Sequence, residues 1–161
     1  MSVLFDPREV VEIAIEMEDM GNEFYKELAR NAKEEEVKAL FSKLADDELR
    51  HKEDFSKMLS SAEYLIVQES YPDEWIGYVR ALLASRTVVG RDSLKAMAEE
   101  MKDPKEAIDV GITMEKDTIL LYEMLRKFMS ASGEEVVDRI LSQEYTHLKD
   151  LYELKLSLSS R

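Results

Sequence analysis

Hydrophobic residues recur at helical spacing along four long stretches of the chain, at about residues 6–30, 34–60, 103–128 and 133–158. A spacing near 3.6 residues predicts helices that bury one face. Short polar turns join the first stretch to the second and the third to the fourth, so each pair is expected to form an antiparallel αα-hairpin. The pattern therefore predicts an all-α fold, a four-helix bundle made of two hairpins.

The openings of the two hairpins repeat each other. DPREVVEIAIEME at residues 6–18 and DPKEAIDVGITME at 103–115 are identical at six of thirteen positions. Both begin with Asp and then Pro, which predicts helix caps at Asp6 and Asp103. Ser132 is the expected cap of the last helix. Such an internal repeat predicts pseudo-two-fold symmetry between the hairpins.

The segment between the hairpins, about residues 62–102, reads as a helical crossover. It predicts a helix over Trp75–Ser85 after Tyr71 to Glu74, and another over Leu94–Met101 capped by Asp92 or Ser93. With hairpin 1 at about 6–60 and hairpin 2 at about 103–158, residues 1–161 are expected to form a single domain.

Composition narrows the function classes. The net charge of −13 argues against nucleic acid and anionic membranes as partners. No apolar run approaches 18 residues and no signal sequence is evident, so a cytoplasmic protein is expected. The chain has no Cys, which excludes disulfides, Cys-ligated metals and thiol catalysis.

The chain has two His, and each lies in a Glu-x-x-His. Each hairpin reads Glu, then Glu-x-x-His about 30 residues later. The six residues of this pattern are Glu18, Glu48, His51, Glu115, Glu144 and His147.

These glutamates fall on the inward faces of their helices, where an unpaired carboxylate is costly. Four carboxylates at one height of a bundle would repel one another. Two divalent cations would neutralise them, with two neutral imidazoles completing the ligand set. The alternatives are carboxylates that reach solvent and a core network of protonated acids.

The chain resembles the rubrerythrin branch of the ferritin-like diiron-carboxylate proteins. The resemblance is carried by EMEDMGNEFYKELA (16–29), LADDELRHKEDF (44–55), TMEKDTILLYEML (113–125) and SQEYTHLKDL (142–151). It implies a ferritin-like bundle and makes all six residues of the repeated pattern metal ligands. Glu48 and Glu144 would bridge the two ions, Glu18 and Glu115 would be terminal, and each His would bind one ion.

Four further residues are candidates for the surroundings of the ligands. Tyr25 and Tyr122 match a habit of the family, although core aromatics with outward hydroxyls are an equal interpretation. Asp47 and Gln143 each precede a motif glutamate and are expected to reach the His of the opposite hairpin.

Three features depart from the family pattern. Thr118 stands where peroxide-reducing rubrerythrins have an additional Glu. There is no Cys₄ iron domain, so a separate electron-donor protein would be needed. The 66 residues that separate Glu48 from Glu115 are more than is typical of the family, and the crossover helices among them would form a dimer face or cover the site.

The leading hypothesis is a diiron oxidoreductase that reduces peroxide or dioxygen, in a homodimer. Manganese or a mixed pair of metals is the alternative to iron, since carboxylate-rich sites accept both. Two other functions stay open: iron or manganese sequestration without turnover, and a structural bundle without metal.

Overall fold

The computed structural model describes residues 6–66, 72–85 and 91–160. These residues form six α-helices and one short 3₁₀ helix and contain no strand. The helices are α1 (Pro7–Asn31), α2 (Glu35–Leu59), α3 (Asp73–Ser85), α4 (Arg91–Glu100), α5 (Pro104–Leu125), η1 (Arg126–Phe128) and α6 (Ala131–Ser159).

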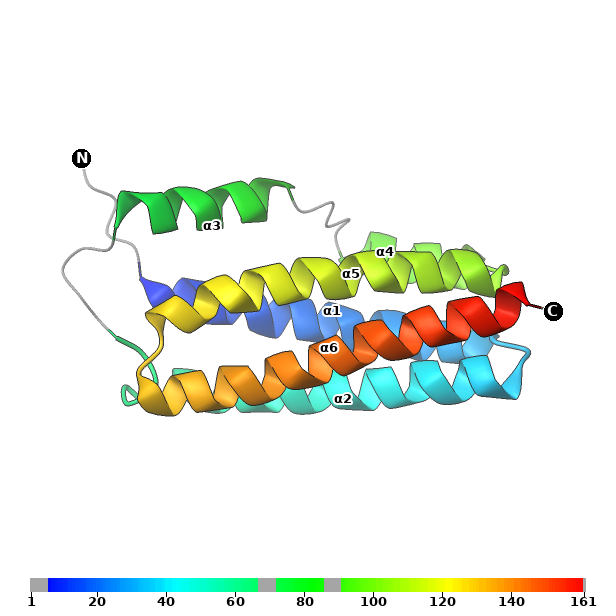
Figure 1. The fold of residues 1–161 in the computed structure, drawn as a ribbon, viewed down its shortest axis with the longest axis horizontal. Coiled ribbons are helices and arrows are strands. Elements are labelled where there is room, and N and C mark those ends of the chain that lie inside the picture. Colours follow the sequence, from blue (N-terminus) through cyan, green and yellow to red (C-terminus); the bar gives the residue numbers. More distant parts are fainter. Residues whose placement is uncertain (1–5, 67–71, 86–90, 161) are drawn as a thin grey trace.

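Helices α1, α2, α5 and α6 run alongside one another as an elongated bundle, and α3 and α4 lie outside it on the side of α5 (Figure 1). The α1–α2 and α5–α6 pairs are the two αα-hairpins that the hydrophobic pattern predicts. The predicted all-α four-helix bundle with a helical crossover is thus confirmed.

The helix starts follow from local capping, with one correction. The side chain of Asp6 accepts a hydrogen bond from the Arg8 backbone N–H, and Asp103 accepts one from Lys105, as expected. The prediction of Ser132 as the cap of α6 is wrong. Ser130 is the cap, and its hydroxyl accepts from the Gly133 N–H at 3.3 Å.

The crossover helices begin earlier than the sequence suggests. Helix α3 starts at Asp73, two residues before Trp75, and α4 starts at Arg91, so neither Asp92 nor Ser93 precedes it. Tyr71 lies outside the described residues. Helix α4 packs on α1, where the Asn31 side chain donates to the Ala98 carbonyl at 3.1 Å.

Two apolar clusters fill the bundle, and a polar layer separates them. One cluster contains Phe55, Tyr122 and Phe128, and the other contains Tyr25 and Phe41. Each cluster therefore contains one of the two candidate tyrosines, Tyr122 in the first and Tyr25 in the second. Across the described residues, no helix combines the length and the apolar content needed to cross a membrane.

Candidate metal centre

The six residues of the repeated pattern meet in the middle of the bundle. Helix α1 contributes Glu18, α2 contributes Glu48 and His51, α5 contributes Glu115, and α6 contributes Glu144 and His147. Each of the six is at most 4% exposed. The three-residue spacing of Glu-x-x-His puts both side chains on one helix face. The sequence pattern therefore becomes one enclosed cluster.

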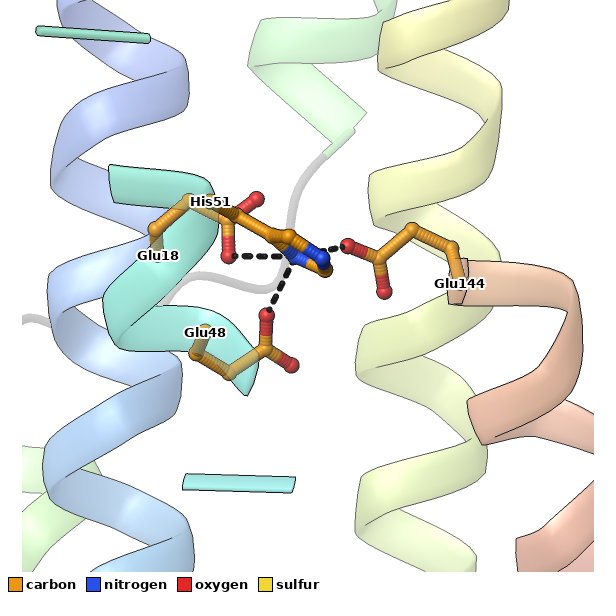
Figure 2. Close-up of side chains that lie close together, drawn as sticks. All are labelled: Glu18, Glu48, His51 and Glu144. Carbon is orange, nitrogen blue, oxygen red and sulfur yellow. Dashed lines mark hydrogen bonds and ion pairs between the residues drawn. The ribbon is translucent and has the colours of Figure 1, made fainter. Parts of the chain in front are cut away.

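The cluster divides into two overlapping groups. One holds Glu18, Glu48, His51 and Glu144, and the other holds Glu48, Glu115, Glu144 and His147. Within each group the four potential ligand atoms lie within 4.8 Å of one another. Figure 2 shows the first group, in which three carboxylates from three helices converge on the His51 ring. Glu48 and Glu144 belong to both groups.

Both histidines turn Nδ1 toward the carboxylates. His51 Nδ1 lies 2.8 Å from Glu144 Oε1, 3.2 Å from Glu48 Oε2 and 3.7 Å from Glu18 Oε2 (Figure 2). His147 Nδ1 lies 3.1 Å from Glu144 Oε2 and 3.7 Å from Glu48 Oε1. Each Nδ1 is thus the nitrogen placed to bind a metal.

The outer nitrogens of the histidines contact the opposite hairpin. His51 Nε2 lies 2.8 Å from Gln143 Oε1, and His147 Nε2 lies 3.2 Å from Asp47 Oδ2. Both contacts are those expected from the sequence. Arg50 donates to the other oxygen of Asp47.

The two tyrosines also reach across the hairpins. The Tyr25 hydroxyl donates to Glu115 Oε1 at 2.5 Å, and the Tyr122 hydroxyl donates to Glu18 Oε1. Both hydroxyls are buried, so the interpretation with outward hydroxyls is wrong. Each glutamate that belongs to a single group is therefore held by a tyrosine of the other hairpin.

Burial and mutual repulsion change the proton affinities of the cluster. Burial raises the pKa of Glu115 to about 7, and burial with the charge of Glu18 raises the pKa of Glu48 well above its usual range. Burial alone would lower the pKa of His147, but the carboxylates of Glu115 and Glu144 beside its ring raise it to about 11. Without a metal, protons take up part of the negative charge.

The donor set fits a pair of divalent metal ions. Carboxylate oxygens and imidazole nitrogens suit iron and manganese. One buried oxygen, Glu144 Oε1, makes no hydrogen bond with the described residues, although it lies 2.8 Å from His51 Nδ1. A buried acceptor without a donor is rare in a native protein, and a cation beside it would satisfy it.

Two helical glycines lie against the cluster, and Gly111 belongs to the second copy of the repeated opening. A Cβ on Gly21 would lie 3.4 Å from Glu48 Cγ, and one on Gly111 would lie 3.3 Å from the Tyr25 hydroxyl. Glycine inside a helix is unfavourable by itself. Its presence in α1 and α5 was therefore the feature of the sequence that could have indicated close packing at these positions.

Thr118 does not belong to either group of potential ligands. It is half-buried and lines a groove of about 590 Å³ between α1, α4 and α5, together with Met17, Met20 and Met114.

Comparison with known proteins agrees with this geometry. The rubrerythrin family model matches residues 9–155. A crystal structure from Thermotoga maritima, described as that of a ferritin-like diiron-carboxylate protein, is 27% identical in sequence with a TM-score of 0.70. The similarity covers 96% of this chain and 97% of that one. Comparison with curated proteins found no match.

Proposed function

Because the chain belongs to the rubrerythrin family, we propose that it is a diiron oxidoreductase that reduces peroxide or dioxygen. The observation that carries this proposal is the pair of buried four-residue groups that share Glu48 and Glu144. Two groups with two shared carboxylates are the arrangement that a dinuclear centre requires.

The proposed ligand set is the one expected from the sequence. Glu48 and Glu144 belong to both groups and would be shared by two ions, and Glu18 and Glu115 would each serve one ion. His51 and His147 would each hold one ion through Nδ1. Two ferrous ions held there would supply two electrons to the oxidant.

The other residues of the chain hold and enclose this centre. Tyr25 and Tyr122 orient the terminal glutamates by donating to one oxygen of each, which leaves the second oxygen for metal binding. The two apolar clusters on either side keep bulk water from the polar layer. Since the chain has no Cys, a separate electron-donor protein would restore the reduced state.

Sequestration of iron or manganese without turnover is the second candidate. It is favoured by Thr118, which takes the place of the additional glutamate of peroxide-reducing rubrerythrins and offers no carboxylate. Both candidates need the same ligands, and they differ in whether the bound metals react repeatedly with an oxidant.

The test begins with anaerobic loading of the full chain with Fe(II) and with Mn(II). About two ions per chain are expected for the native protein by mass spectrometry. The His51→Ala/His147→Ala variant is expected to bind fewer. Glu18→Gln, which removes one proposed ligand, is also expected to bind fewer ions. Glu16→Gln is its matched control, since Glu16 is exposed on the same helix two residues away.

Loaded protein is then mixed with stoichiometric peroxide or dioxygen, and iron oxidation is followed by absorbance. Oxidation within minutes, followed by repeated turnover with a reductant, supports the oxidoreductase. Iron binding without turnover supports sequestration. A native protein that binds no metal would leave only the structural bundle.

A further inference from the structure

The two halves of the metal centre differ in the residue that contacts the outer nitrogen of each histidine. We call Glu115, His147 and the shared glutamates the His147 half-site, and Glu18, His51 and the shared glutamates the His51 half-site. Asp47 and Gln143 occupy the same place in the repeat, one residue before each motif glutamate. One is a carboxylate and the other an amide.

Each of these residues is the hydrogen-bond partner of one histidine. Asp47 Oδ2 lies 3.2 Å from His147 Nε2, and Gln143 Oε1 lies 2.8 Å from His51 Nε2. Because the Nδ1 atoms face the carboxylates, a metal-bound ring carries its proton on Nε2 and donates it outward. The outward acceptor is therefore ionic in one half-site and neutral in the other.

A carboxylate acceptor makes an imidazole a stronger electron donor than an amide does, because it draws the Nε2 proton toward itself. Asp47 is 8% exposed, so solvent screens its charge only weakly. Arg50 binds the other oxygen of Asp47 from a mostly exposed position, which offsets part of this effect and fixes the orientation of the carboxylate.

We propose that Asp47 and Gln143 make the two metal positions unequal, so that the His147 half-site binds the first ion. The inference rests on the proposed dinuclear centre and deepens it. Asp47 and Gln143 are positioning residues, since they act on the metals through the histidines. The six proposed ligands and the tyrosine that holds each terminal glutamate are matched between the two halves by the repeat.

The test places one equivalent of Mn(II) in the metal-free full chain and locates it by anomalous scattering in crystals. Mn(II) is chosen because carboxylate-rich sites accept it and it does not react with oxygen as readily as Fe(II). Repulsion between two ions weakens the second binding step at either position. The readout is therefore where the first ion lies, and not the difference between two binding constants.

In the native protein, occupancy at the His147 half-site is expected to exceed that at the His51 half-site by about tenfold. This is the lower end of what loss of an outer-shell partner usually costs in metal affinity. Asp47→Asn keeps the shape and removes the charge, so it should bring the two occupancies close together. Asp47→Asn combined with Gln143→Glu should reverse the order.

Asp46→Asn is the matched control. It removes the same charge one residue away, at an exposed position. Among the described residues, Asp46 makes no hydrogen bond to either histidine. It should leave the native preference unchanged.

Equal occupancies in the native protein, or a native order that persists in the Asp47→Asn/Gln143→Glu variant, would overturn the inference while leaving the dinuclear centre in place. Failure of the native protein to bind Mn(II) or Fe(II) would instead overturn the centre itself, and the inference with it.

Discussion

The side chains around the cluster are placed by hydrogen bonds that cross from one hairpin to the other. Tyr122 of α5 donates to Glu18 of α1, and Tyr25 of α1 donates to Glu115 of α5. These bonds link residues 104 and 90 positions apart in the chain. They join the hairpins at the layer where the core is polar and apolar packing contributes least.

Replacement of Tyr122 by Phe should therefore destabilise the metal-free protein. The change removes one hydrogen bond and leaves Glu18 Oε1 buried without its donor, which costs about 1–3 kcal/mol. Denaturant unfolding by circular dichroism measures the loss.

Tyr145→Phe is the matched control for Tyr122→Phe. Tyr145 donates to Glu123 at 2.6 Å, but it is 49% exposed, so water can replace the lost bond. The expected change is below about 1 kcal/mol. Equal losses of unfolding free energy in the two variants would show that the buried hydrogen bond stabilises the protein no more than the exposed one.

Helix α6 begins against the loop that follows α2. Backbone hydrogen bonds join Ser130 N–H to the Tyr64 carbonyl at 2.9 Å and Ile66 N–H to the Phe128 carbonyl at 2.9 Å. Gly133 lies in the first turn of α6, where a Cβ would come within 2.2 Å of the Tyr64 carbonyl oxygen. This close approach of the backbones admits only glycine.

Gly133→Ala should consequently lower the free energy of unfolding by about 1–3 kcal/mol, as overpacking does. Gly77→Ala is the control, because no atom of the described residues lies within 4 Å of a Cβ there and Gly77 is inside α3. That variant should be stabilised by about 0.5–1 kcal/mol. Thermal and denaturant melts compare the two. A loss in both variants, of similar size, would contradict the steric explanation.

The helices also show which features of the fold could be predicted from the sequence. Helical periodicity and the Asp-Pro openings predicted the four long helices, because amphipathic spacing and capping act locally. The start of α6 was misplaced by two residues, because both Ser130 and Ser132 can cap a helix. The choice depends on the loop after α2, whose Glu63 carbonyl accepts a hydrogen bond from the Ser130 hydroxyl.

At the site, the repeat predicted which six residues would gather, because it places a Glu or a Glu-x-x-His on the inward face of each of the four long helices. Gly21 was missed, since its part depends on the distance between α1 and the Glu48 side chain. Such a distance comes from packing between helices and leaves no periodic signal in the sequence.

In the molecule as a whole, the cluster links folding to proton binding and to metal binding. Burial raises the pKa of Glu115 from 4.5 to about 7. Burial alone would lower the pKa of His147, but the carboxylates of Glu115 and Glu144 raise it from 6.5 to about 11. The metal-free folded state thus binds protons more tightly than the unfolded chain at both residues. A group of this kind stabilises the fold below its unfolded pKa and loses that contribution as pH rises toward its folded pKa.

Stability of the metal-free protein is therefore expected to fall between about pH 5 and pH 8. Glu115 contributes to the fall up to about pH 7, and His147 contributes above about pH 6.5. Burial alone would raise the pKa of Glu144, but its close contacts with the rings of His147 and His51 lower it, so this residue acts in the opposite sense only at lower pH. Melting temperatures measured with a chelator present would record this slope.

Metal binding should reverse the dependence of stability on pH, so that the loaded protein becomes more stable as pH rises. The reason is that the ions compete with protons for the same carboxylates and imidazoles. The stabilisation on loading with Mn(II), taken as the difference in melting temperature between loaded and chelated protein, is expected to grow over the same range. The His51→Ala/His147→Ala variant should show little of that growth. A loaded-minus-chelated difference that shrinks with rising pH would mean that the metals bind elsewhere than at the buried cluster.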